Sequence, residues 1–298
     1  MTECVKNSSS EKRTDAVLKK LKEIHIGTYI VFLLVLLFIF IPLYVMLATS
    51  VMTDAEAIGT TFHFIPKMGI TFDAYKTAFT RETGGPKLIV AFFNSIWIYV
   101  PGVLVGAFMS AFCAYAFAKL DFKTKNISFA ILMSGLTLPN CLGTISSFLL
   151  FDALNWVNTP LPLIVPNMLG SVSVMFFLRQ FYMGIPDDLL GAGRVDGLGE
   201  FGLFFKIMLP ISIPPILSQF ILRFIVAYND YLGPLLYLQN SAFYPMTIAI
   251  SFFTEAFVQN WPLQMAGCTI AMLPLLLLYL LSQKFILAGV AVTSGLKG

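Results

Sequence analysis

The chain is organised around one polar stretch, Ile185-Pro-Asp-Asp-Leu-Leu-Gly-Ala-Gly-Arg-Val-Asp-Gly-Leu-Gly-Glu-Phe-Gly-Leu-Phe-Phe-Lys-Ile-Met-Leu-Pro210, between two apolar segments of membrane-spanning length. Glycines at 191, 193, 197, 199 and 202 interrupt what otherwise reads as two short helices. Each glycine costs a helix about 1 kcal/mol relative to alanine, but the bare backbone lets another surface approach closely. Leu189, Ala192 and Val195, spaced by three, predict one apolar face on the first helix. An ordinary connecting loop is the alternative interpretation.

Composition places the protein in a membrane. Hydrophobic residues make up 57% of the 298 residues and charged residues only 12%, against about 25% charged in soluble domains. The mean hydropathy is +0.82. A net charge of +3 is too small to indicate nucleic acid as a partner. The four cysteines show no metal-binding spacing, so no metal site is expected.

Six apolar segments approach or exceed the roughly 20 residues that a membrane-spanning helix needs. We expect spans at about 29–50, 88–120, 127–150, 161–182, 211–236 and 264–287. Pro139-Asn140 predicts a kink in the third span. The sequence thus predicts an all-α polytopic membrane protein with an N-terminal segment 1–28, a six-span domain 29–288, a polar loop 183–210 and a tail 289–298.

Basic residues are distributed unequally between the two sides that six spans define. One side carries both termini, the 183–210 loop and fourteen Lys or Arg residues: Lys6, Lys12, Arg13, Lys19, Lys20, Lys22, Lys119, Lys123, Lys125, Arg179, Arg194, Lys206, Lys284 and Lys297. The other side carries four: Lys67, Lys76, Arg81 and Lys87. We expect a multi-pass protein of the cell (plasma or inner) membrane, and the positive-inside rule predicts that both termini and this loop lie in the cytoplasm.

Small residues recur every four positions in the second predicted span, at Gly102, Gly106, Ser110, Ala114 and Ala118. In lipid there is no hydrophobic drive between helices, so small residues that allow close van der Waals contact indicate helix packing. We expect this stripe to pack within the chain or against a partner subunit.

The fifth predicted span carries a line of polar residues. At 100° per residue Gln219, Arg223 and Asp230 share one helix face, with Asn229 adjacent. A charged side chain inside a membrane usually faces the bundle interior or water. Two interpretations stand: a buried polar patch that orients helices, or the wall of an aqueous route for a polar solute.

The order of several motifs resembles a known family. Ile185-Pro186, then Gly-Ala-Gly-x-x-Asp196-Gly197, then Leu209-Pro210, is similar to the EAA loop of ABC-importer permeases. The run Tyr228-Asn-Asp-Tyr-Leu-Gly-Pro234 resembles the "WNDF/YLWP" run of sugar permeases. From about residue 30 to the C-terminus, the chain resembles the permeases of carbohydrate ABC importers of the maltose-transporter type.

This resemblance implies the type I ABC-importer permease fold, with cytoplasmic coupling helices that dock on an ATPase. The implied ATPase contacts are Gly191, Ala192, Gly193, Arg194, Asp196, Gly197, Glu200, Leu209 and Pro210, with a second contact at Ser294, Gly295 and Lys297. Tyr228, with Asn229 and Asp230, joins Gln219 and Arg223 in the predicted translocation pathway. The usual loop glutamate is replaced here by Gly191.

The implied partners are a second permease, two ATPase subunits, an extracytoplasmic solute-binding protein, membrane lipid and a sugar. The chain has no Gly-x-x-x-x-Gly-Lys-[Ser/Thr] motif and no recognisable catalytic set. We therefore expect no enzymatic activity and no bound cofactor, with ATP and Mg on the partner subunits. The alternatives are an ion-coupled secondary carrier, an ABC importer for a non-sugar solute, a membrane-embedded enzyme or a purely structural subunit.

Overall fold

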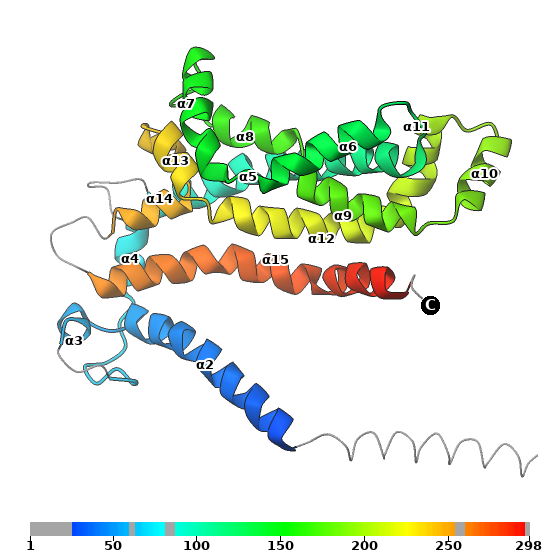
Figure 1. Ribbon diagram of the computed structural model, residues 1–298. Helices are drawn as coiled ribbons and strands as arrows, with labels where there is room; N and C mark the ends of the chain where they lie inside the picture. The colour runs from blue at the N-terminus through cyan, green and yellow to red at the C-terminus, as the bar shows by residue number, and fades with distance from the viewer. Residues whose placement is uncertain (1–25, 60–62, 81–86, 254–259, 296–298) are drawn as a thin grey trace, which may run out of the picture.

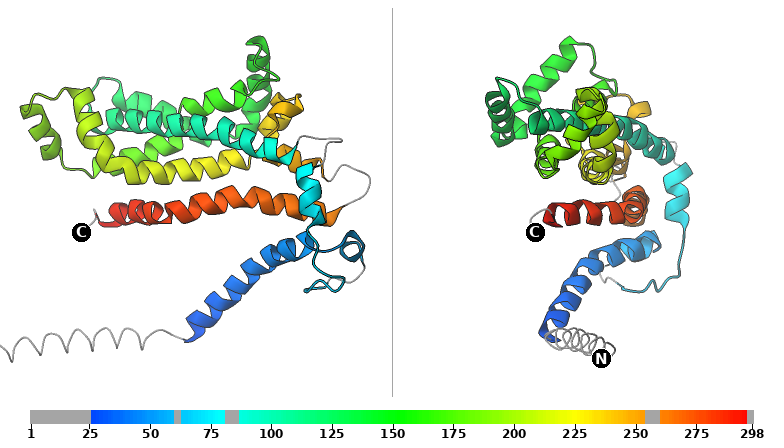
Figure 2. Two further views of the ribbon diagram at one scale, coloured as in Figure 1. Left: turned by 180° about the vertical axis from the view of Figure 1, so that it is seen from behind. Right: turned by 90° about the vertical axis from the view of Figure 1, so that its right-hand side faces the viewer.

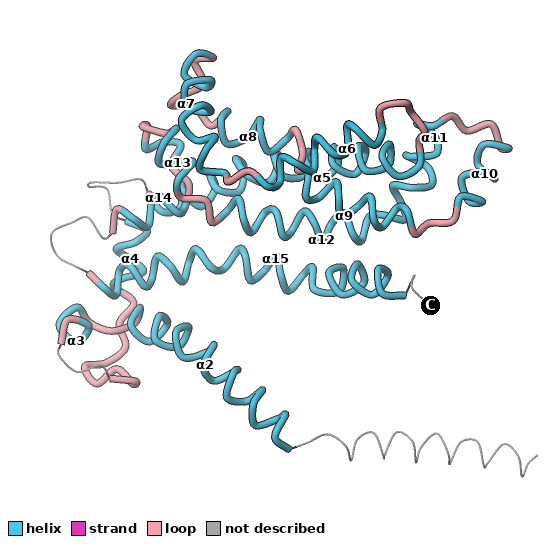
Figure 3. The backbone as a smooth tube through the Cα atoms, viewed as in Figure 1, coloured by secondary structure: helices cyan, strands magenta, loops and turns pink. Residues whose placement is uncertain are grey.

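The computed structural model describes residues 26–59, 63–80, 87–253 and 260–295, and this part of the chain contains helices and no strand (Figures 1 and 3). The predicted all-α fold is confirmed. The α-helices are α2 (Ile26–Ser50), α3 (Asp54–Ala57), α4 (Asp73–Thr80), α5 (Leu88–Lys119), α6 (Lys125–Ser134), α7 (Thr144–Ala153), α8 (Leu161–Met168), α9 (Val172–Met183), α10 (Asp187–Val195), α11 (Glu200–Leu203), α12 (Leu209–Tyr228), α13 (Leu232–Tyr237), α14 (Met246–Ser251) and α15 (Trp261–Gly295).

Within the described residues, five helices are long and apolar enough to cross a membrane: Gly27–Ser50, Leu88–Lys119, Leu161–Met183, Glu200–Tyr228 and Trp261–Gln283. The expected count of six is not confirmed, because the segment predicted at 127–150 is not one helix. There α6 ends at Ser134, and short 3-10 turns precede α7. Leu138 has an extended backbone (φ −80°, ψ 127°), as a following proline favours. The segment that contains α6 and α7 nevertheless runs along the bundle, from the end that carries α10 towards the opposite end (Figure 1).

Helix α5 lies at the centre of the bundle and packs chiefly on α8, α9 and α12. Its small residues bring the backbones together: a Cβ on Gly106 would lie 2.0 Å from the carbonyl oxygen of Asn167, and one on Gly102 would lie 3.0 Å from that of Ile164. The Ser110 hydroxyl donates to the Gly106 carbonyl at 2.7 Å and accepts from the Ser171 amide at 2.9 Å. The stripe therefore faces α8 and the α8–α9 junction within this chain. Ala114 is also buried, while Ala118 is half-buried.

The fifth predicted span, 211–236, has different limits in the structure. Helical backbone is continuous from Glu200 to Tyr228, through a π-helical stretch at Phe204–Met208. Leu209 and Pro210, expected in the loop, therefore begin α12 inside this continuous helix. The helix ends early because the Asp230 carboxylate accepts a hydrogen bond from the Gly233 amide at 3.2 Å and starts a turn into α13.

The ends of the long helices define two ends of the molecule. The start of α2, the end of α15 and helix α10 lie at one end, and α4, α7, α13 and α14 lie at the other (Figures 1 and 2). Ser294 and Gly295 form the last turn of α15. Lys297 and all but the last three residues of the expected N-terminal segment lie outside the described residues.

Candidate functional site: the helix α10 region and the polar face of α12

Helix α10 forms between two well-defined ends. Asp187 and Asp188 occupy its first turn, where negative charge interacts favourably with the helix dipole. At its other end Gly197 has φ +81°, its amide donates to the Arg194 carbonyl at 3.0 Å, and the Leu198 amide donates to the Gly193 carbonyl at 3.0 Å. These bonds make a Schellman motif, which requires a left-handed residue where glycine stands. Gly197 is thus a helix terminator rather than a helix interior residue.

The inner face of α10 is carried by Leu190 and Gly193, which are buried. A Cβ on Gly193 would lie 2.6 Å from Leu203 Cδ2 and 2.7 Å from Ile207 Cδ1, whereas a Cβ on Gly191 would meet nothing within 4 Å. Only one of the two glycines is therefore needed for packing. The helix lies against α11 and the π-helical stretch through a contact that a larger residue would disturb.

The apolar face predicted at Leu189, Ala192 and Val195 exists, but it points away from the protein. All three residues are exposed, and Val195 is 88% exposed. The helix stands beyond the bundle at one end of the molecule (Figures 1 and 2). An apolar face that the chain itself does not cover is a surface on which another protein can bind.

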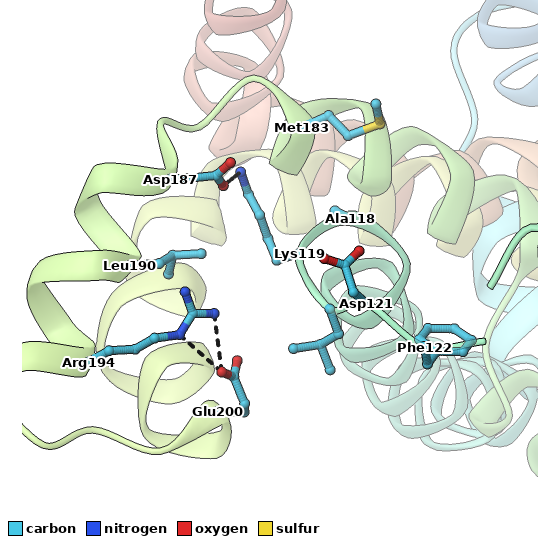
Figure 4. Close-up of a pocket in the computed structure, with 10 residues that line it drawn as sticks. Ala118, Lys119, Asp121, Phe122, Met183, Asp187, Leu190, Arg194 and Glu200 are labelled. Atoms are coloured by element: carbon cyan, nitrogen blue, oxygen red, sulfur yellow. Dashed lines mark hydrogen bonds and ion pairs between the residues drawn. The ribbon is translucent and has the colours of Figure 1, made fainter. Parts of the chain in front are cut away.

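Lys119, the last residue of α5, holds the start of α10. Its ammonium group donates to the Ile185 carbonyl and to Asp187 Oδ1, both at 2.6 Å (Figure 4). The Lys119 side chain is only 5% exposed, while that of Asp187 is 82% exposed. The hydrogen bond and charge of Lys119 lower the pKa of the Asp187 carboxyl below its ordinary value.

A second polar contact, between Arg194 and Glu200, holds the C-terminal end of α10. Arg194, in the last turn of α10, contacts Glu200 Oε1 through Nε and a terminal nitrogen, each at 3.1 Å (Figure 4). The Tyr115 hydroxyl donates to Glu200 Oε2 at 2.8 Å. Glu200 therefore links α5, α10 and the start of α11.

A pocket of about 810 Å³ lies between these contacts (Figure 4). It is lined by the end of α5, the turn that follows it and the region from Met183 to Glu200, and its lining includes Lys119, Asp187, Leu190 and Arg194. Of the nine sequence-predicted loop residues, the structure groups Gly193, Arg194 and Glu200 around the inner side of α10. Leu209 and Pro210 lie further along the α12 helix.

Gln219 and Arg223 lie one turn apart on α12, whereas Asn229 and Asp230 lie beyond its end at Tyr228. Arg223 is half-buried and its terminal nitrogen donates to Asn167 Oδ1 at 3.4 Å, rather than to Asp230. Tyr228 is buried, and its hydroxyl donates to the Ala271 carbonyl of α15 at 3.1 Å. Asn229 is exposed and Gln219 is half-buried. Asn167 has no charge and lies in a short apolar helix, so the sequence offered only its polarity as a signal.

The tertiary structure adds two residues that sequence reasoning did not assign to this region, Lys119 and Tyr115. Both lie near the end of an apolar helix, more than sixty residues from their partners. A cation at the last turn of a long apolar helix was the available signal for Lys119; nothing in the sequence marked Tyr115.

A helical bundle of this kind, with long apolar helices and a short exposed helix at one end, defines a multi-pass membrane protein. The model of the family described as "Binding-protein-dependent transport system inner membrane component" matches residues 87–292. The chain belongs to this family, and the resemblance inferred from its motifs is confirmed.

Curated relatives and a solved structure agree with that assignment. The chain is 31% identical over 268 residues to the arabinooligosaccharides transport system permease protein AraQ of Bacillus subtilis, covering 89% of this chain and 93% of the relative. It is 32% identical to the protein of the same name from Halalkalibacterium halodurans, over 83% of this chain and 86% of that one. It shares its fold, with a TM-score of 0.72 at 17% identity, with a chain of a bacterial ABC transporter involved in alginate import, covering 91% and 97% of the two chains.

Proposed function

We propose that this chain is one of two membrane subunits of an ATP-driven importer that receives a sugar or oligosaccharide from an extracytoplasmic binding protein. Family membership supports the importer. Three relatives named as transport permeases for arabinooligosaccharides, polygalacturonan/rhamnogalacturonan and lactose support the substrate class. ATP and Mg belong to partner ATPase subunits in this proposal. The chain itself supplies half of the route through the membrane.

The main observation behind the proposal is that one face of α10 packs on the protein while the opposite, apolar face is exposed. Its inner face is fixed to α5 and α11 by Lys119–Asp187, Gly193 and Glu200, while Leu189, Ala192 and Val195 face outward. A partner groove that covers the outer face would move α10 and the bundle behind it as one body. This is what a mechanical link between ATP-driven closure and helix movement requires, because a loosely attached helix would not transmit displacement.

The charge distribution supports a cytoplasmic position for α10. Among the described residues, its end of the molecule carries Lys119, Lys123, Lys125, Arg179, Arg194 and Lys206, and the opposite end carries Lys67, Lys76 and Lys87. An excess of Lys and Arg favours the cytoplasmic side. In this orientation the start of α2 and the end of α15 are cytoplasmic too.

A cross-linking experiment tests the coupling contact. With native cysteines replaced by serine, Val195→Cys is expected to cross-link to a co-purified ATPase subunit in membranes. Ile145→Cys on α7 is the matched control, because it is 75% exposed and lies at the opposite end. ATPase adducts at position 145 and none at position 195 would show that the ATPase binds at the end of the molecule opposite α10, and would contradict the proposal.

The translocation pathway is tested at Arg223. Its half-buried guanidinium, near Asn167, and the polar side chains of Gln219, Asn229 and Asp230 suit the hydroxyl groups of a sugar, which donate and accept hydrogen bonds. Arg223→Leu is expected to reduce uptake while the complex still assembles; normal uptake would remove Arg223 from the pathway. Uptake measured with a panel of sugars, peptides and polyamines decides the substrate class.

A further inference from the structure

A second pocket, distinct in chemistry from the one beside α10, opens at the turn between α5 and α6. It has a volume of about 580 Å³ and is lined by Asp121, Phe122, Lys123, Lys125, Asn126 and Arg179. Three cations and one carboxylate leave it with a net charge of +2. Arg179 comes from α9 and the other five residues come from the turn and the start of α6. The positive charge of the pocket therefore depends on the packing of α9 beside this turn.

Two of the cations are held in place by the protein. The Lys125 ammonium donates to the Leu120 carbonyl at 2.8 Å and contacts Asp121 Oδ1 at 3.5 Å. Arg179 Nε donates to the Phe117 carbonyl at 3.2 Å, and its guanidinium carbon lies 4.2 Å from the centre of the Phe129 ring. The terminal nitrogens of Arg179 have no hydrogen-bond acceptor among the described residues, which leaves them available for an anion.

Lys123 is the most accessible of the three cations. It is exposed and forms no ion pair within the described part of the chain. A flexible ammonium group next to an oriented guanidinium suits an anion with several oxygen atoms, such as a phosphate, because the guanidinium offers paired donors and the ammonium adds a point charge.

The surroundings of the pocket favour a lipid over a protein partner. Along α6, directly after the basic turn, Ile127 is 66% exposed and Ile131 is 65% exposed. The Phe117 ring lies against the rings of Phe122 and Phe129, with 5.7 Å between the centroids of each pair. Phenylalanine rings carry no polar atom, so they extend the apolar surface of α6 to the charged rim of the pocket.

From this arrangement we infer that the 121–126 turn and Arg179 bind the phosphate headgroup of an anionic phospholipid from the cytoplasmic leaflet. The inference rests on the orientation given under Proposed function. Basic pockets between membrane helices on the cytoplasmic side bind such headgroups. The acyl chains of the lipid lie along the exposed apolar side chains of α6. Because Asp121 and Phe122 line both this pocket and the one beside α10, the bound lipid adjoins the coupling region.

Native mass spectrometry of the full chain, with whatever subunits co-purify, measures this binding. Dioleoylphosphatidylglycerol is expected to be retained in preference to dioleoylphosphatidylcholine. Lys123→Gln should weaken retention about fivefold, because one cation near an anionic lipid surface contributes about 1 kcal/mol. Lys123→Arg should restore retention. Lys76→Gln, which removes an exposed lysine from the opposite end, is the matched control.

Three results would overturn the inference. The first is equal retention of phosphatidylglycerol by the wild type and Lys123→Gln. The second is displacement of the lipid by inorganic phosphate at the same concentration, which would indicate a soluble anion. The third is an ATPase adduct instead of a lipid adduct from a photoreactive amino acid at position 123. Charge-dependent lipid retention without a co-purified ATPase would instead contradict the proposed function and leave the lipid site standing.

Discussion

The hydroxyl of Tyr115, near the end of α5, donates a 2.8 Å hydrogen bond to Oε2 of Glu200, the first residue of α11. The two residues are 85 positions apart. Glu200 also binds Arg194 of α10, so this one carboxylate joins the central helix of the bundle to the exposed helix. The contact gives α10 a direct mechanical connection to the membrane helices.

Tyr115→Phe removes the hydroxyl and leaves the ring in place. We expect a loss of about 1 kcal/mol of stability, as for one typical intramolecular hydrogen bond, and less solute transported per ATP hydrolysed. Thermal unfolding and the transport-to-ATPase ratio measure the two effects. Tyr279→Phe on α15, which is exposed, is the control; a Tyr115→Phe protein with unchanged coupling would show that Arg194 and Lys119 suffice.

Gly193→Ala and Gly191→Ala separate packing from helix propensity. Both gain about 1 kcal/mol of helix propensity, but the added methyl at 193 lies 2.6 Å from Leu203 Cδ2, and such overpacking costs about 1–3 kcal/mol. Gly191→Ala should therefore raise the thermal midpoint more than Gly193→Ala does. Equal midpoints for the two variants would mean that α10 does not pack on α11 as described.

Gly197→Ala forces a Cβ into a left-handed conformation at φ +81°, at a cost of about 1–2 kcal/mol. The C-terminal end of α10 is then misplaced and co-purification of an ATPase should fall, while membrane insertion persists. Gly199→Ala is the matched control, because Gly199 has φ −73° and open space around it. Equal ATPase recovery from both variants would remove the requirement for the turn.

Gly106→Ala should disrupt the central packing of the bundle. The new Cβ would lie 2.0 Å from a backbone oxygen of Asn167, which cannot rotate away, so the cost lies at or above the upper end of about 1–3 kcal/mol. Lower yield and thermal midpoint are expected. Gly135→Ala, with nothing within 4 Å, should behave as the wild type, and an equal loss in both would indicate a general intolerance of alanine.

Asp187 makes stability depend on pH. Its pKa is lowered in the folded protein by Lys119, so its stabilising effect is complete above the ordinary carboxyl pKa of about 4 and is lost as the pH falls through the lower folded value. The difference in thermal midpoint between wild type and Asp187→Asn should be constant from pH 8 to about 5 and shrink below about 4. Asp188→Asn is the control; a difference that shrinks near pH 7 would assign the effect to another group.

Much of the architecture follows from local composition. Apolar segments such as 88–120 and 264–287 were predicted as helices, because in a bilayer each backbone amide and carbonyl must find its partner within the helix itself. The polar, glycine-rich 185–210 stretch could be recognised as an exception to that pattern. Pro139 marked a break in the third segment, although a kink was expected and the structure has separate helices.

Other features depend on residues far apart in the sequence. Nothing local determines that Lys119 binds Asp187, or that Arg223 binds Asn167 instead of Asp230, which lies just beyond the end of its own helix. The sequence also could not predict that Val195 faces outward, because spacing by three predicts an apolar face but not what covers that face.

Local sequence is enough to predict that this protein is helical, lies in a membrane and belongs to the transport family that its loop motif resembles, because length, hydropathy and glycine placement act locally. The side chains that hold α10, and the face of α10 that stays uncovered, depend instead on tertiary packing. Such pairings are set when α5, α9 and α12 pack against one another, because packing joins residues such as Tyr115 and Glu200, which are 85 positions apart in the sequence.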